Sequence, residues 1–389
     1  MPGRNPYDGL LGGPSDGEGG FESAAGGGPP SPPDPAYLID ELSRDIAWLE
    51  EQLGEPADPE VLERLKQDAE RALWEVADLG GDARFSRRDE ANLEAVVHSD
   101  GSRPVLFVKD DFFDAGAPAA TTWGMSLMQV EAEVRKVCRA VGRVNDPRVP
   151  IGYQGTAWMI DEGVVVTNYH VLKAISLNPS RTADGTFTGT LAPGVSVDFG
   201  VEIGGGPPDR SFPIRRVLGV GRAGAPEFAH PTVGEVNFDG LDLAVLELDR
   251  VPGRQFPAPV EVARGDDPQT QGGLASRGRR VYLVGFPGNP GSTTPDVFAE
   301  LFAGVKGVKR LTPGLLTEGR GEREDDARKW IIGHDASTLG GSSGSLVVDL
   351  EAGGRKVLGL HFAGVPARVN WAHGLEGVTP DLAAVIPGW

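Results

Sequence analysis

Two stretches near the N-terminus repeat apolar residues at three- and four-residue steps, the spacing that places apolar side chains on one face of a helix. The first stretch contains Leu38, Leu42, Ile46, Leu49 and Leu53. The second contains Leu62, Leu65, Ala69, Leu73 and Val76. Gly54 ends the first stretch, and Asp58 with Pro59 supplies an N-cap and a first turn for the second. This pattern predicts a helical hairpin.

Shorter signals follow the hairpin. Ser86, with Asp89 three residues later, resembles a capping box for a third helix that would run to about Val97. Residues 105–108 read Val-Leu-Phe-Val and predict a short strand, whereas residues 125–141 have the apolar spacing of an amphipathic helix.

The pattern changes at about residue 143. From there, short runs of Val, Ile, Leu and Phe alternate with clusters of Gly, Pro, Asn and Asp, which is typical of an all-β barrel or sandwich. Residues 155–160 and 164–167 predict a β-hairpin, and residues 346–349 and 357–360 predict a second pair of strands. A terminal helix is expected from about Thr379.

Composition completes the expected domain layout. Residues 1–36 contain ten glycines and eight prolines with almost nothing apolar, so burial cannot offset the entropy of ordering them and a disordered tail is expected. Residues 173–238 are also rich in Gly and Pro, which predicts surface loops that enlarge the β domain. We expect a tail at 1–36, a helical accessory region at 37–142 and a β domain at 143–389.

Charge and cysteine content limit the function classes. The formal net charge of −19 argues against a nucleic-acid partner, because phosphate binding needs a basic surface. No apolar run is long enough to span a membrane, and the N-terminus lacks the apolar segment of a signal peptide. The single cysteine, Cys138, cannot form an intrachain disulfide, so a reducing, cytoplasmic location and a buried thiol are expected. The histidines do not fall at metal-ligand spacing, so no metal and no cofactor are expected.

Two polar residues stand at the ends of apolar strands. His170 follows the predicted hairpin, where a rigid backbone could hold a general base; a packed, neutral core histidine is the alternative. Asp242 precedes the apolar run 243–248, where a carboxylate is costly unless it is paired. Such an aspartate could accept the Nδ1 proton of a histidine and fix its tautomer, or it could be an ordinary turn or cap residue.

A Gly- and Ser-rich string precedes the strand predicted at 346–349. Gly340 and Gly341 allow a tight turn, so the N–H groups of Gly341 and Ser343 can point at one spot and form an oxyanion hole. Ser343 Oγ could then attack a carbonyl carbon while His170 removes the hydroxyl proton. A flexible linker is the alternative, although the flanking apolar strands disfavour it.

The order His170, Asp242, Ser343, with separations of 72 and 101 residues, is the order of the chymotrypsin triad. The resemblance to chymotrypsin in this order implies a chymotrypsin-like double six-stranded β-barrel with this triad, preceded by the helical region. A competing Gly-x-Ser-x-Gly elbow would use Ser342 as nucleophile, but that elbow is followed by a helix and a strand is predicted here.

Three motifs resemble those of bacterial trypsin-like peptidases, most closely the glutamyl-endopeptidase (V8-like) branch. They are Thr167-Asn168-Tyr169-His170-Val171, Asp242-Leu243-Ala244-Val245 and Gly341-Ser342-Ser343-Gly344-Ser345. The resemblance implies that Thr338 and His361 line the primary specificity pocket, and that an acidic residue precedes the scissile bond. It also implies that the backbone of Phe362, Ala363 and Gly364 pairs with the substrate as an added strand. The alternative for His361 is a hydrogen-bonded core histidine.

The expected function is that of a serine endopeptidase that cleaves proteins or peptides through an acyl-enzyme intermediate, with residues 37–142 as a docking or regulatory region for a protein partner. Two alternatives stay open. One is a catalytically silent peptide-binding or scaffold protein that retains the barrels. The other is an esterase or lipase, which the expected fold disfavours.

Overall fold

A computed structural model of the chain describes the residues that carry the fold. They are residues 35–53, 59–79, 103–117, 120, 123–182, 186–222, 238, 240–267, 273–287, 306–324, 326–338, 342–365 and 369–386. The chain divides into two compact units, of which the larger comprises residues 105–116, 123–291 and 305–389.

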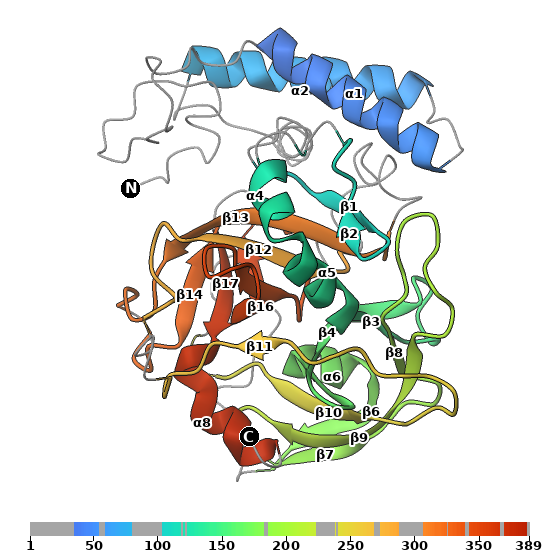
Figure 1. Cartoon of the computed structure of the whole chain (residues 1–389). Coiled ribbons are helices and arrows are strands. Elements are labelled where there is room, and N and C mark those ends of the chain that lie inside the picture. The colour runs from blue at the N-terminus through green and yellow to red at the C-terminus, as the bar shows by residue number, and fades with distance from the viewer. Residues whose placement is uncertain are drawn as a thin grey trace. The chain divides into compact units, whose positions relative to one another are not determined.

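The smaller unit contains the predicted helical hairpin. Helices α1 (Pro35–Leu53) and α2 (Pro59–Leu79) contact each other, and Figure 1 shows them side by side. Each helix begins at a proline, a residue that suits the first helical turn because its missing N–H would have no intrahelical partner. Six residues of the predicted apolar stripes are buried: Leu38, Leu42, Ile46, Leu65, Ala69 and Leu73. The predicted third helix at 86–97 and the tail before Pro35 lie outside the described residues.

The larger unit holds two closed antiparallel β-barrels, as the strand pattern predicted (Figure 1). In the first barrel the order around the ring is β10-β5-β4-β3-β8-β9. Its strands are β3 (Val141–Asn145), β4 (Tyr153–Asp161), β5 (Val164–Thr167), β8 (Ser196–Asp198), β9 (Ser211–Val220) and β10 (Ala244–Leu248). The predicted hairpin is β4–β5, in which Trp158 pairs with Val166.

The second barrel closes through the order β12-β15-β16-β17-β14-β13, because β12 also pairs with β13. Its strands are β12 (Arg280–Gly285), β13 (Arg310–Glu318), β14 (Ile331–His334), β15 (Leu346–Asp349), β16 (Lys356–Val365) and β17 (Val369–Gly374). The short β11 (Glu261–Val262) adds to β16 in parallel. The strand pair predicted at 346–349 and 357–360 is present as β15 and β16.

Segments that precede the barrels in sequence belong to the same compact unit. Strand β1 (Leu106–Lys109) pairs with β13 of the second barrel and with the short β2 (Phe112–Phe113). The helix predicted at 125–141 is divided at Val130 into α4 (Gly124–Gln129) and α5 (Glu131–Ala140), and α5 contacts β2 and β3. Cys138 is fully buried on α5, as predicted, and burial raises the pKa of its thiol to about 12.

A cluster of buried charges connects β1 to both barrels. Lys309, which is fully buried before β13, donates to Phe199 O at 2.8 Å and pairs with Glu202 Oε1 at 3.3 Å. The other oxygen of Glu202 accepts the N–H of Asp111 at 3.1 Å, and Asp111 pairs in turn with Arg210 at 2.6 Å. Buried charges are tolerated only when they are paired and hydrogen-bonded, and this cluster ties Asp111, in the turn after β1, to segments next to both barrels.

The region at 173–238 differs from its expectation. Instead of surface loops alone, it contains barrel strands β8 and β9 together with a separate two-stranded sheet, β6 (Ser176–Arg181) and β7 (Phe187–Leu191). In the described part of this region most glycines and prolines lie outside the strands, and the average composition of the region concealed the strands.

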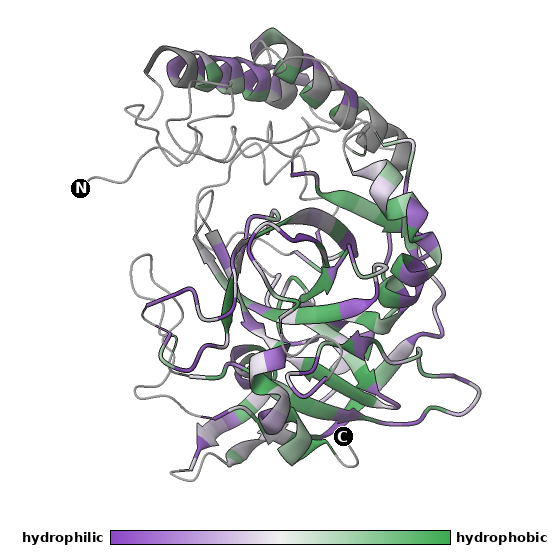
Figure 2. Cartoon of the chain, turned by 60° about the vertical axis from the view of Figure 1, so that its left-hand side comes forward, coloured by the Kyte–Doolittle hydropathy of each residue, from purple (hydrophilic) through white to green (hydrophobic). Residues whose placement is uncertain are grey.

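The C-terminal helix α8 (Leu375–Val385) begins four residues earlier than predicted and contacts β9, β16 and β17. Figure 2 shows that hydrophobic residues lie along the barrel strands. Within the described residues, no helix is both long and apolar enough to cross a membrane.

Candidate active site

His170 lies in the first turn of α6 (Tyr169–Ala174), which follows directly from the end of β5. The buried strand fixes the start of the helix, and Asn168 is the extended residue that precedes it. The first amides of a helix have no intrahelical acceptor. The N–H of His170 finds one outside the helix, in Asp242 Oδ1 at 2.9 Å.

Asp242 lies just before β10, and its side chain is 1% exposed. Its second oxygen, Oδ2, lies 2.6 Å from His170 Nδ1, so the carboxylate holds both the main chain and the ring of the histidine. Burial raises the pKa of Asp242, but the field of His170 and the hydrogen bonds from its ring and main chain offset burial, and the pKa lies below its usual value. The carboxylate is therefore ionised at neutral pH.

Ser343 lies in the turn before β15, and two contacts hold this turn. The carbonyl of Ser343 accepts the N–H of Thr156 on β4 at 2.9 Å, and the N–H of Gly344 donates to His361 O on β16 at 3.0 Å. Gly344 has a φ of +88°, and a Cβ there would lie 2.0 Å from Thr156 O. Only glycine fits this turn, because an L side chain would be strained and would overlap β4.

The serine turn and helix α6 meet at Gly155 on β4. A Cβ on Gly155 would lie 2.8 Å from Val171 Cγ2 and 3.0 Å from Ser343 O. The residue next to His170 and the main chain of Ser343 therefore touch the same point of the first barrel. Gly341, the other predicted oxyanion donor, lies outside the described residues.

Four of the predicted substrate-binding residues lie on β16: His361, Phe362 and Ala363, which are buried, and Gly364. The fifth, Thr338, lies between β14 and β15. Thr338 Oγ1 hydrogen-bonds to Asn370 Oδ1 on β17. A Cβ on Gly364 would lie 3.5 Å from Thr338 Oγ1, so Thr338, Gly364 and Asn370 converge.

The family pattern described as the trypsin-like peptidase domain matches residues 155–360, more than half of the chain. The chain belongs to the trypsin-like peptidase family. It is also 29% identical over 378 residues to a probable serine protease of Lysobacter enzymogenes, a match that covers 94% of this chain and 93% of that protein.

Solved structures that are similar to the chain include two forms of the M. tuberculosis protease Rv3671c. The inactive form has a TM-score of 0.37 and 19% identity, over 67% of this chain and 95% of that one. The active form has a TM-score of 0.38 and 21% identity, over 67% of this chain and 86% of that one.

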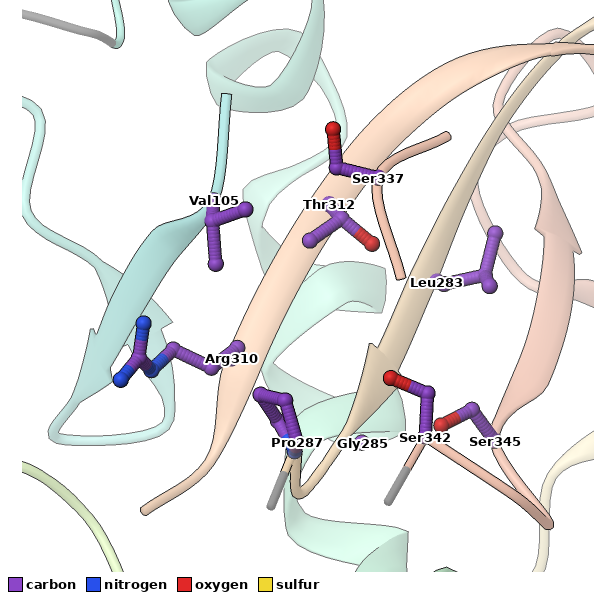
Figure 3. Close-up of a pocket in the computed structure, with 9 residues that line it drawn as sticks. All are labelled: Val105, Leu283, Gly285, Pro287, Arg310, Thr312, Ser337, Ser342 and Ser345. Carbon is purple, nitrogen blue, oxygen red and sulfur yellow. The ribbon is translucent and has the colours of Figure 1, made fainter. Parts of the chain in front are cut away.

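The alternative elbow with Ser342 as nucleophile does not fit this trypsin-like peptidase, because the turn leads into strand β15 and not into a helix. Ser342 is buried and lines a small pocket on the inner side of the turn together with Ser345. Figure 3 shows the two hydroxyl groups turned the same way, with Val105 and Arg310 on the far wall.

Sequence reasoning missed several residues that hold the site of this trypsin-like peptidase. Asn168 Nδ2 donates to Asp242 O at 2.9 Å, and His373 Nε2 accepts the N–H of Asp242 at 3.0 Å. His334 Nε2 lies 3.2 Å from His361 Nδ1. The available signal was that His334, His361 and His373 all stand within apolar strand sequences, where an unpaired polar ring would be costly.

The turn at Gly344 generates the first prediction. Gly344→Ala should destabilise the peptidase by about 1–3 kcal/mol for the strained backbone and by a similar amount for the overlap with β4. Gly353→Ala is the matched control, since Gly353 has a φ of +79° with nothing within 4 Å of an added Cβ. Urea unfolding of both variants measures the difference, and equal losses would contradict the close contact between the serine turn and β4.

Three buried histidines generate a pH prediction. Burial lowers the pKa of His361 to about 3 and of His373 to about 4, and it lowers the pKa of His334 well below the usual value. In the unfolded chain these rings titrate near pH 6.5. The histidines should therefore not lower the free energy of unfolding above about pH 6.5. Below about pH 6.5 the free energy of unfolding should fall as the pH decreases toward the pKa values of the folded protein, by about 1.4 kcal/mol per pH unit for each histidine.

Urea unfolding of wild type and of His334→Phe between pH 6.5 and pH 5 tests this slope. The variant has one titrating ring fewer, so its stability should depend less steeply on pH, by about 1.4 kcal/mol per unit. Parallel pH dependences in the two proteins would show that the ring of His334 is not held neutral by the fold.

Proposed function

We propose that the chain is a serine endopeptidase in which His170, Asp242 and Ser343 form the catalytic triad. The observation that carries the proposal is the buried, ionised Asp242, whose two oxygens hold the main chain and the ring of His170. A carboxylate in this position fixes the histidine tautomer with Nδ1 protonated, which leaves Nε2 free of a proton and able to act as a base.

The proposed reaction is acyl transfer through Ser343. Ser343 Oγ bonds to the carbonyl carbon of the scissile bond while its proton passes to His170 Nε2, and the carbonyl electron pair moves onto oxygen. The N–H groups of Ser343 and Gly341 stabilise this oxyanion. The C–N bond then breaks, the proton passes from His170 to the leaving amine, and water hydrolyses the acyl-enzyme with His170 as base.

An open strand edge supports peptide binding. Strand β15 pairs with β16 only as far as Leu360, whereas β17 continues along the other side to Val365. Among the described residues, the stretch from Phe362 to Gly364 therefore has a partner strand on one side only. A substrate peptide can add to the open side as an extended strand, with main-chain hydrogen bonds that do not depend on its sequence.

The buried histidine pair supports a preference for an acidic residue before the scissile bond, as in the V8-like branch. If His334 Nε2–H donates to His361 Nδ1, the second nitrogen of His361 carries a proton and can donate to a substrate carboxylate. Both rings are neutral, because burial lowers both pKa values, so His361 would bind the carboxylate as a hydrogen-bond donor. Thr338 adds a hydroxyl close to Gly364.

We propose that residues 37–142, which include most of α1 and all of α2, dock a protein partner or regulate the peptidase. The cytoplasmic location inferred from the single cysteine stays a prediction.

Active-site labelling tests the proposed nucleophile. A fluorophosphonate probe should react covalently with wild type and with Ser342→Ala, and the reaction should disappear in Ser343→Ala and fall by several orders of magnitude in His170→Ala. The modified residue is identified by mass spectrometry. An unreactive wild-type protein would instead favour the silent scaffold, and labelling that survives in Ser343→Ala would move the nucleophile elsewhere.

Cleavage-site profiling tests the proposed specificity. A peptide library digested by wild type, with Ser343→Ala as the blank, should show Glu and Asp enriched before the cut. His361→Leu should lower kcat/KM for acidic substrates on the order of thirtyfold, because a hydrogen bond to a charged group contributes about 2 kcal/mol. Cleavage without acidic enrichment would refute the V8-like preference and leave the endopeptidase proposal intact.

A further inference from the structure

A second histidine, His373, contacts the residue that holds His170. It lies on β17, where it pairs with Leu360 of β16. Its Nε2 accepts the main-chain N–H of Asp242 at 3.0 Å, across 131 residues of sequence. This hydrogen bond joins the second barrel to the segment that contains Asp242. That segment continues into β10 of the first barrel.

Every polar group of Asp242 has a partner. Its carboxylate oxygens bind His170, its carbonyl accepts from Asn168, and its N–H donates to His373. The first three bonds involve the β5–α6 segment, so His373 provides the only one of these contacts that comes from the second barrel. The serine turn belongs to that second barrel. The bond from His373 therefore places the carboxylate relative to the barrel that carries Ser343.

The ring of His373 is held rigidly. It stacks on Phe362 with ring centroids 4.1 Å apart and planes 12° from parallel, and Trp330 packs against it edge-on at 6.1 Å. Burial lowers the pKa of the ring to about 4, so it is neutral at pH 7. Because Nε2 accepts a hydrogen bond from the Asp242 N–H, the proton of the neutral ring must be on Nδ1.

That tautomer is costly. Among the residues that the structure describes, Nδ1 of His373 has no hydrogen-bond partner, although the ring is fully buried. A buried donor without a partner is destabilising, and an apolar ring in the same space would avoid this penalty. The acceptor at Nε2 is the feature that an apolar ring would lack.

We propose that His373 is a positioning residue of the triad, which fixes the main chain of Asp242 and thereby the contact between its carboxylate and His170. The inference rests on the proposed function. Without the acceptor, the buried N–H of Asp242 would have to find another partner, and the segment before β10 would shift. A shift of a few tenths of an ångström is enough to weaken a general base that acts through a 2.6 Å contact.

The test uses two variants of equal length and shape. His373→Gln keeps an acceptor oxygen at about the distance of Nε2, whereas His373→Met fills the same space without one. Both lose the aromatic stacking, so any shared loss of stability cancels in the comparison. Trp330→Phe is the packing control, because it disturbs the far edge of the ring and leaves the acceptor in place.

The measurement is the rate constant of Ser343 labelling by a fluorophosphonate, which requires no known substrate. His373→Met should react at least tenfold more slowly than His373→Gln. The difference should lie in the rate constant of the covalent step and not in the affinity for the probe. Trp330→Phe should react at the wild-type rate. The low-field proton resonance of the short bond between His170 and Asp242 should also move upfield in His373→Met and stay near its wild-type position in His373→Gln.

Equal labelling rates in His373→Gln and His373→Met would overturn the positioning role, as would a slow reaction in Trp330→Phe equal to that in His373→Met. If His373→Met does not fold, His373→Phe replaces it, because its slightly larger ring can still stack on Phe362 and contains no nitrogen acceptor. A wild-type protein that does not react at all would refute the triad itself, which separates failure of the proposed function from failure of this inference.

Discussion

The geometry of the site depends on one strand residue, Thr156, at the junction of the two barrels. Its N–H donates to Ser343 O, its hydroxyl accepts the N–H of Phe286 after β12, and its carbonyl accepts the hydroxyl of Thr167. The first two bonds come from the second barrel and the third from β5, directly before α6. Thr156 is fully buried, so a broken bond here could not be replaced by one to water, and these bonds hold the two barrels together at the serine turn.

A second constraint is the cost of burying Asp242. Burial alone would favour the neutral acid, and a neutral acid could not stabilise a charged imidazolium during reaction. The field and the hydrogen bonds of His170 reverse this preference and keep the carboxylate ionised. The same desolvation that makes the carboxylate costly also strengthens its interaction with the imidazole, because little solvent screens it. Stability and the proposed chemistry therefore draw on the same buried pair.

Local patterns predicted the fold well where elements are decided locally. The hairpin β4–β5, the strands β15 and β16 and the helices α1 and α2 follow from apolar spacing and turn residues. The pattern did not locate strands β6 to β9 within residues 173–238, because short strands separated by glycine and proline resemble loops until a closing partner is known. It also gave no sign that β1, about 200 residues before β13 in sequence, pairs with that strand, since pairing across such a distance is not set by a local pattern.

The sequence by itself determined the residue types and their order: His170 at a strand end, Asp242 before an apolar run, and Ser343 in a glycine-rich string before a strand. Those are local properties, set by backbone conformation and by the cost of an unpaired charge. Only the tertiary structure decided the partners that hold these residues, Thr156 behind the serine turn and His373 behind the aspartate. Thr156 lies on a strand of the first barrel and holds a turn of the second, and His373 lies on a strand of the second barrel and holds a segment of the first. A hydrogen bond between barrels leaves no periodic pattern in the sequence.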